Sequence, residues 1–142
     1  SHVAAQDLFI AVAAVADWRV RNRASQKIKK TEEQRTPSLE FDENVDILAA
    51  VAALEKKPYC VGFAAESENL VEYGEAKRRR KNIPLLVGNI GHQTFGQDHN
   101  ELVLFDDNGH TPLPPGDKQT LARQLIGEIA QRMARSSLNA YP

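Results

Sequence analysis

Three short apolar runs, at residues 8–14, 59–65 and 83–88, limit how this chain can fold. Each is rich in aliphatic side chains and bounded by polar or turn-forming residues, which is typical of a strand covered on both faces of a parallel sheet. None approaches the roughly 20 residues that a membrane-spanning helix needs. The runs therefore predict a sheet protein with helices on both faces, and we expect no membrane partner.

Helices are predicted between and after these runs. Asn44 is placed to cap a helix whose apolar residues recur at helical spacing until about residue 57. Residues 68–81 predict a second helix, with acidic residues early and five consecutive basic residues at 77–81, as the helix dipole favours. Residues 117–135 carry one apolar stripe and predict the last helix.

Short strands and loops account for most of the remainder. Asp107-Asn108-Gly109 between residues 101–106 and 110–113 is a strong hairpin signal. Residues 38–42 alternate polar and apolar side chains, which predicts a short edge strand. Residues 19–30 contain six basic side chains and no acidic one, and we interpret them as a loop.

Alternating strands and helices indicate an α/β fold, a Rossmann-like and mostly parallel sheet with flanking helices and a C-terminal hairpin. In that class, ligands bind beyond the carboxyl ends of the strands. Residues 13–17, residues 63–66 and the loop from Asn89 are then expected along one edge, which is the candidate site.

Composition excludes several classes of function. With 42% apolar residues, the 142-residue chain can bury one core, and its net charge of −1 gives no bulk attraction to nucleic acid. Cys60 is the single cysteine, which fits a reducing, cytoplasmic compartment. The four histidines lack metal-ligand spacing, and the sequence has no Walker A loop, GxGxxG or GxSxG motif.

Asp17 follows the small residues AAVA at the end of the first run. An acidic side chain there can accept hydrogen bonds from sugar hydroxyls or hold a cation. A helix cap or a salt bridge to Arg19 explains it equally well.

Lysines are concentrated in two further places. In QKIKK, extended backbone would point Lys27 and Lys29 one way while Ile28 packs the other way. The segment is then either a mobile lid for a polyphosphate or a solvated loop. Lys77 and Lys81 share a helical face and fit either an anionic ligand or compensation of the helix dipole.

Six ordered motifs, AAVADWR, QKIKK, ENVDIL, VGFAAES, EAKRRRKN and FGQDHNELVLFDDNG, together resemble phosphopantothenate-cysteine ligase. The resemblance runs from Asp7 to Arg132. It implies CTP-dependent joining of 4'-phosphopantothenate to L-cysteine through an acyl-cytidylate, in coenzyme A biosynthesis. It also implies Mg²⁺ with the nucleotide, a homodimer and a cytoplasmic location.

The resemblance assigns a role to each matching residue. Lys27 would be the catalytic lysine of a basic flap at residues 19–36, and Asp17 would bind the nucleotide or its cation. The other implied nucleotide-binding residues are Ala11, Val12 and Ala13 after the first run, Asn44, Val45, Asp46 and Ile47 in one turn, and Phe63, Lys77 and Lys81 at the cytosine end. No metal ligand is identified.

The sequence departs from the family pattern in two ways. Val45 stands where the family usually has proline, which should loosen the turn but keeps the Asn44 and Asp46 side chains. Family members also begin earlier, with a glycine-rich strand, loop and helix, so we interpret residues 1–142 as the C-terminal portion of one ligase domain with an unpaired sheet edge. FMN is expected only if a longer protein carries the decarboxylase domain that is often fused to this ligase.

Two other functions remain open on the sequence. One is half of a dinucleotide-binding oxidoreductase, with the basic residues around a 2'-phosphate, although no glycine fingerprint is visible. The other is a binding module that uses residues 77–81 to contact anionic partners.

Overall fold

The computed structural model describes residues 2–13, 15–29, 36, 38–66, 70–90 and 101–139. The chain forms two compact units. The first comprises Ser1–Ala13 with Leu48–Pro142, and the second comprises Ala14–Ile47. The predicted basic flap, residues 19–36, falls entirely within the second unit.

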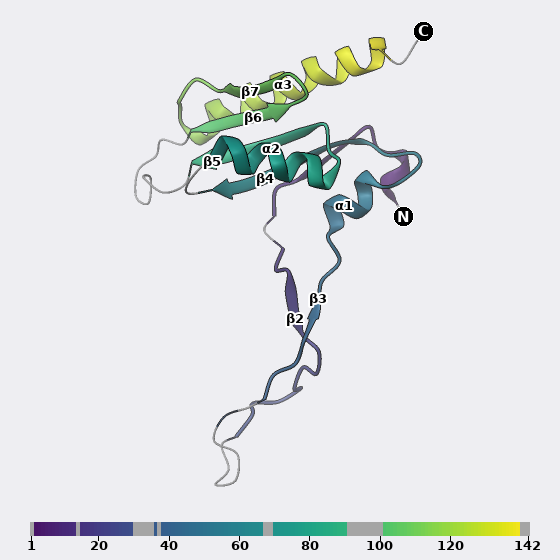
Figure 1. Ribbon diagram of the computed structural model, residues 1–142, viewed down its shortest axis with the longest axis vertical. Coiled ribbons are helices and arrows are strands. Elements are labelled where there is room, and N and C mark those ends of the chain that lie inside the picture. The colour runs from purple at the N-terminus through teal and green to yellow at the C-terminus, as the bar shows by residue number, and fades with distance from the viewer. Residues whose placement is uncertain are drawn as a thin grey trace. The chain divides into compact units, whose positions relative to one another are not determined.

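The first unit is built on a five-stranded sheet (Figure 1). The spatial order of its strands is β1 (Leu8–Ala11), β4 (Tyr59–Glu66), β5 (Leu85–Ile90), β6 (Leu102–Asp106) and β7 (Gly109–Pro112). The first three strands in this order are parallel, and the last three are antiparallel. The predicted α/β fold is therefore confirmed, with its hairpin at one edge of the sheet.

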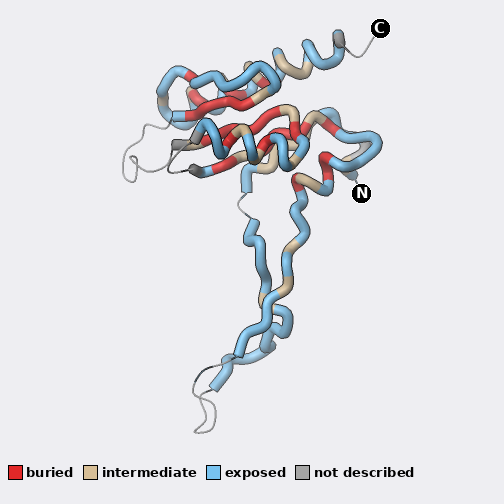
Figure 2. Tube along the Cα trace, viewed as in Figure 1, coloured by how far each residue is buried: buried red, intermediate tan, exposed pale blue. Residues whose placement is uncertain are grey.

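Helices cover both faces of this sheet. α1 (Ile47–Ala52) contributes Leu48 and Val51 to one face, and α2 (Leu70–Lys81) covers the same face, with Gly74 against the ring of Phe105. α3 (Lys118–Asn139) covers the other face with Leu121, Leu125 and Ile129. A 3-10 turn (His2–Ala5) precedes β1. Figure 2 shows the buried residues following the central strands, as expected for a sheet between two helical layers.

Local hydrogen bonds explain where the hairpin and the last helix begin. The Asn108 amide donates to Asp106 Oδ1 at 2.8 Å, and Gly109 adopts a φ of 110°, which favours glycine. The Thr120 amide donates to Asp117 Oδ1 at 2.8 Å, so Asp117 caps α3. Both elements confirm the sequence prediction.

Three local predictions are wrong. α1 ends at Ala52 rather than near residue 57, and it begins at Ile47, so Asn44 is not its cap. Asn44 Nδ2 instead donates to the Ala16 carbonyl at 2.7 Å. Residues 19–30 are not all loop, because β2 (Trp18–Val20) pairs antiparallel with β3 (Phe41–Glu43).

The second unit therefore contains a two-stranded ribbon, β2 with β3. Arg21 lies 2.7 Å from Asp42 and 3.2 Å from Glu40, and Arg19 lies 3.7 Å from Asp42. Opposite charges on facing strands favour this pairing, although an isolated two-stranded ribbon is only marginally stable. The side chains of Trp18 and Phe41 are exposed. The predicted edge strand at residues 38–42 thus exists, shifted to Phe41–Glu43.

No helix within the described parts of the chain is long and apolar enough to cross a membrane.

Candidate functional site

The carboxyl ends of β1 and β4 form one edge of the sheet. Ala11, the last residue of β1, lies opposite Gly62 of β4. Phe63 is therefore at the same height along the sheet as Val12, where the chain leaves β1. Val12 and Ala13 in that segment are exposed. Asn89 in β5 pairs with Ala65 and continues the same edge. Of the predicted grouping, residues 13, 63–66 and 89 thus lie along this edge. Residues 15–17 belong to the second unit, and residues 14 and 91–100 lie outside the described residues.

Phe63 is half-buried and packs with the residues beneath α3. Lys77 and Lys81 lie one turn apart on α2, which covers the other face, and both are half-buried. α2 runs back from the carboxyl end of β4 toward the start of β5, and at about 1.5 Å per residue Lys81 lies roughly 16 Å along it from Leu70. Within this unit, the structure therefore does not bring Phe63 and the two lysines together on one face.

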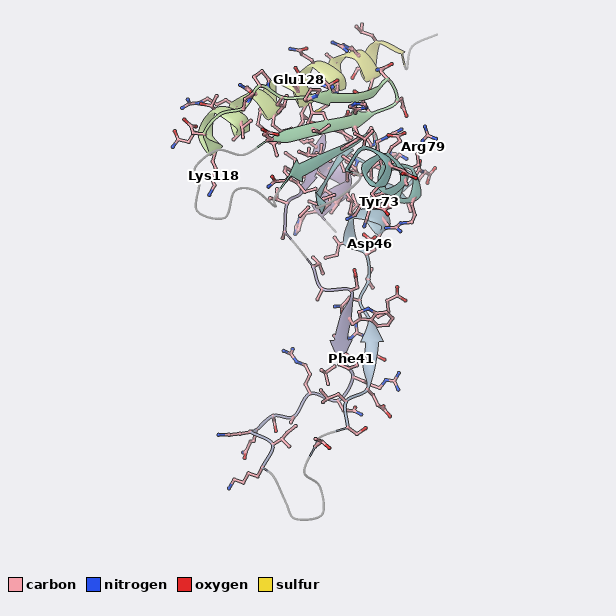
Figure 3. All side chains as sticks on the ribbon, turned by 60° about the vertical axis from the view of Figure 1, so that its left-hand side comes forward. Phe41, Asp46, Tyr73, Arg79, Lys118 and Glu128 are labelled. Carbon is pink, nitrogen blue, oxygen red and sulfur yellow. The ribbon has the colours of Figure 1, made fainter. Side chains whose placement is uncertain are left out.

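The basic run at residues 77–81 is not a uniform positive patch. Arg78 is buried, and its guanidinium lies 3.1 Å from Glu75 and 2.9 Å from Asp107. Arg79 Nε lies 2.7 Å from the same Glu75. Hydrogen bonds from Arg78 hold the pKa of Glu75 below its usual value, and those bonds raise the pKa of Arg78. Figure 3 shows Tyr73 and Arg79 extending outward from α2.

These pairs weaken the interpretation of residues 77–81 as a docking surface for anionic partners. At least two of the five basic side chains, Arg78 and Arg79, already bind acidic groups within the chain. The sequence alone did not show that Arg78 and Arg79, unlike a solvated basic run, form ion pairs within the chain. The signal that could have identified the pairing is Glu75, which stands three and four residues before them.

Asp17 and Asn44 meet at the end of the ribbon. The Asn44 amide donates to the Asp17 carbonyl at 2.7 Å, and Arg19 Nη1 donates to Asn44 Oδ1 at 3.3 Å. Asp17 is exposed, and none of the described ion pairs includes it, because Arg19 pairs with Asp42 instead. The proposed salt bridge between Asp17 and Arg19 is therefore not formed, and the Asp17 carboxylate faces solvent.

Lys27 lies in the described segment between β2 and β3, and its side chain is exposed. Lys29 is exposed too, and Ile28 is 59% exposed. The expectation that Ile28 would pack beneath the lysines is therefore wrong for this segment. An exposed ammonium group without regular backbone around it retains the freedom to follow a ligand, at the cost of ordering the segment on binding.

The turn from Asn44 to Ile47 presents apolar side chains to solvent. Val45 is 70% exposed and Ile47 is 51% exposed. Asp46 stands immediately before α1, the position that a helix cap occupies. The Asn44 side chain secures the turn to Ala16, so the missing proline does not leave it without a restraint.

An open cavity of about 600 Å³ lies at the opposite edge of the sheet. Its lining includes Tyr59 at the start of β4, Pro84 before β5 and Asp107 in the hairpin turn, together with Arg78 and Cys60. Burial raises the pKa values of Tyr59 and Cys60, so both stay protonated near neutral pH and neither is an activated nucleophile. The sequence did not point to this cavity, because its lining comes from residues that are far apart in the chain, at the starts of β4 and β5 and at the ends of α1, α2 and α3.

The described residues contain no group of three or more His, Cys, Asp or Glu side chains arranged to hold a metal ion. His2 and His110 are exposed, and His92 and His99 lie outside the described residues.

Comparison with known proteins places this geometry in a family. The Vibrio cholerae "Coenzyme A biosynthesis bifunctional protein CoaBC" is 42% identical over 130 residues, which are 89% of this chain and 33% of that protein. The chain thus spans about a third of the length of the curated relatives it matches.

Solved structures agree on the fold. The structure of the C-terminal domain of a CoaBC protein matches with a TM-score of 0.71 at 28% identity, and the match covers 96% of this chain and 58% of that one. A complex of the Cab2 mutant H337A with phosphopantothenate-cysteine matches with a TM-score of 0.62 at 17% identity, over 92% of this chain and 46% of that one. The family model described as "DNA/pantothenate metabolism flavoprotein C-terminal domain" matches residues 1–133, and this chain belongs to that family.

Proposed function

We propose that this chain is the C-terminal portion of a phosphopantothenate-cysteine ligase that uses CTP in coenzyme A biosynthesis. The observation that carries the proposal is the family match over residues 1–133, together with 42% identity to a bifunctional protein of that pathway. The fold neighbour solved with phosphopantothenate-cysteine supports a substrate of the pantothenate type. No observation favours the oxidoreductase alternative.

The reaction would proceed in two displacement steps. The carboxylate of 4'-phosphopantothenate attacks the α-phosphorus of CTP, pyrophosphate leaves, and an acyl-cytidylate forms. The amine of L-cysteine then attacks the acyl carbon and CMP leaves. Such chemistry depends on positioning and charge neutralisation rather than on a protein nucleophile, which fits the protonated, buried Cys60.

Each predicted residue has a role in this scheme. Lys27 would donate hydrogen bonds to phosphate oxygens and stabilise the charge that develops during acyl-cytidylate formation. The exposed residues Val12 and Ala13 would let the nucleotide approach closely. The resemblance also assigns Phe63, Lys77, Lys81 and the Asn44–Ile47 turn to this nucleotide. Because Phe63 lies under α3 and the two lysines lie on α2, the nucleotide would have to extend across the edge of the sheet from one face to the other.

Mg²⁺ would accompany the triphosphate. The exposed carboxylate of Asp17 is suited to supply one ligand, with phosphate oxygens and water completing the shell, since Mg²⁺ sites commonly use few protein ligands. Bound Mg²⁺ would neutralise part of the triphosphate charge. FMN would be bound only if a longer protein carries the decarboxylase domain. A homodimer and a cytoplasmic location complete the proposal.

The test is pyrophosphate release by the complete gene product. With phosphopantothenate and cysteine present, CTP should be consumed and ATP should not. Lys27→Gln should abolish product formation without changing the circular-dichroism spectrum, whereas Lys29→Gln, two residues away, should remain active. Normal turnover by Lys27→Gln would remove the catalytic role from that side chain, and release from ATP alone would contradict CTP dependence.

A further inference from the structure

Asn89 lies at the carboxyl edge of β5, and no role described above includes it. It pairs with Ala65 of β4 on one side and with Leu102 of β6 on the other. Leu85 and Val87 of the same strand pack beneath α3. Because side chains alternate along a strand, Asn89 is directed to that face as well, the face that carries Phe63.

The side-chain oxygen of Asn89 lacks a partner. Asn89 Oδ1 is inaccessible to solvent, and no described residue donates a hydrogen bond to it. Most buried polar atoms in folded proteins are hydrogen-bonded, so an exception requires an explanation. The preceding positions on this face, Leu85 and Val87, are apolar, and packing alone would be satisfied by another apolar residue.

We propose that Asn89 binds the base of the nucleotide through its carboxamide, beside Phe63. This inference rests on the proposed function. A carboxamide offers two N–H donors and one acceptor oxygen, which suits the edge of a nucleobase, while an aromatic ring offers a surface for stacking. The terminal χ2 torsion of asparagine has a broad energy minimum, so the carboxamide can rotate toward the ligand. The base then provides the hydrogen bond that the side-chain oxygen lacks within the protein.

The structure offers a matched control. Gln124 Oε1, on α3, is also buried without a partner among the described residues. Gln124 belongs to a helix rather than to a strand end at the candidate edge, and it has no role in the proposed site. Asn89→Leu and Gln124→Leu therefore each remove one buried, unpaired amide oxygen, and only the first removes a proposed ligand contact.

The experiment measures CTP binding by calorimetry and thermal stability on the complete gene product. Asn89→Leu should raise the Kd for CTP about tenfold, which corresponds to about 1.4 kcal/mol, and leave the KM for phosphopantothenate unchanged. Its Tm should stay the same or rise, because an unsatisfied buried group is lost. The Tm of Gln124→Leu should likewise stay the same or rise, and its Kd for CTP should be unchanged.

Two results would overturn the inference. One is an unchanged Kd for CTP in Asn89→Leu. The other is a marked loss of Tm in Asn89→Leu but not in Gln124→Leu, which would make Asn89 a structural residue. Failure of the wild-type protein to bind CTP would contradict the proposed function and this inference together, whereas equal binding by the wild type and Asn89→Leu contradicts this inference alone.

Discussion

Arg78 on α2 reaches the β6–β7 turn, where its Nη2 lies 2.9 Å from Asp107 Oδ1. Nη1 of the same guanidinium donates to the Ile83 carbonyl at 3.2 Å, and Nε donates to Glu75 at 3.2 Å. One side chain thus joins α2, the segment that leads into β5, and the hairpin. Arg78 is the buried charged residue among those that the structure describes.

Replacing Arg78 should destabilise the first unit. Arg78→Met leaves the Ile83 carbonyl and the half-buried Glu75 without their donor, and hydrogen bonds to charged groups contribute about 1.5–3 kcal/mol each. We expect the free energy of unfolding in urea to fall by about 2–3 kcal/mol, since Glu75 and Asp107 can regain water. The exposed neighbour Arg80, changed to Met, should shift it by less than about 0.5 kcal/mol. Equal urea midpoints for the two variants would refute this role.

Two helical glycines should respond oppositely to alanine. A Cβ on Gly74 would lie 2.7 Å from two ring atoms of Phe105, whereas a Cβ on Gly127 meets nothing within 4 Å. Gly127→Ala should raise the free energy of unfolding by up to about 1 kcal/mol through helix propensity. Gly74→Ala should lower it by about 1–3 kcal/mol, because overpacking outweighs that gain. Thermal unfolding of both variants provides the comparison, and stabilisation by Gly74→Ala would show that α2 does not pack this closely.

Lys77 and Lys81 should matter for the nucleotide more than for the fold. A lost charge-assisted contact is worth about 1–3 kcal/mol, so alanine at either position should weaken CTP binding about 5- to 150-fold. Arg80→Ala on the same helix should leave the Kd for CTP unchanged. Calorimetric titration decides between the roles: unchanged binding by both lysine variants would leave only compensation of the helix dipole.

Much of the fold was predictable because its signals are local. Apolar runs identified β4 and β5, although β5 begins two residues later than predicted. The Asp-Asn-Gly turn identified β6 and β7, and a helical stripe of apolar residues identified α3. β2 escaped prediction because its pairing depends on acidic residues about 20 positions away, and a run of basic residues without them resembles a loop. Asn44 was misjudged for the same reason, since its true partner is Ala16.

The candidate site was predictable at the edge of the sheet but not across its faces. Strand order and register placed Ala11, Phe63 and Asn89 at one edge, as the apolar runs suggested. The sequence did not show that Phe63 lies beneath α3 while α2 carries Lys77 and Lys81 on the other face of the sheet. The face to which a strand residue points depends on the exact register of the strand, which the apolar runs do not fix. The unpaired oxygen of Asn89 is likewise a property of packing, which no motif encodes.

Whether Lys27, Lys77 and Lys81 bind one nucleotide can be tested by acetylating the lysines of the complete gene product with and without CTP and measuring the modification by mass spectrometry. Lys27 is exposed and Lys77 and Lys81 are half-buried, so all three can react in the free protein. Saturating CTP should protect Lys27, Lys77 and Lys81 together, while the exposed Lys118 on α3 should react equally in both samples. Protection of Lys27 without Lys77 and Lys81, or of none of the three, would contradict the claim that these side chains bind one nucleotide.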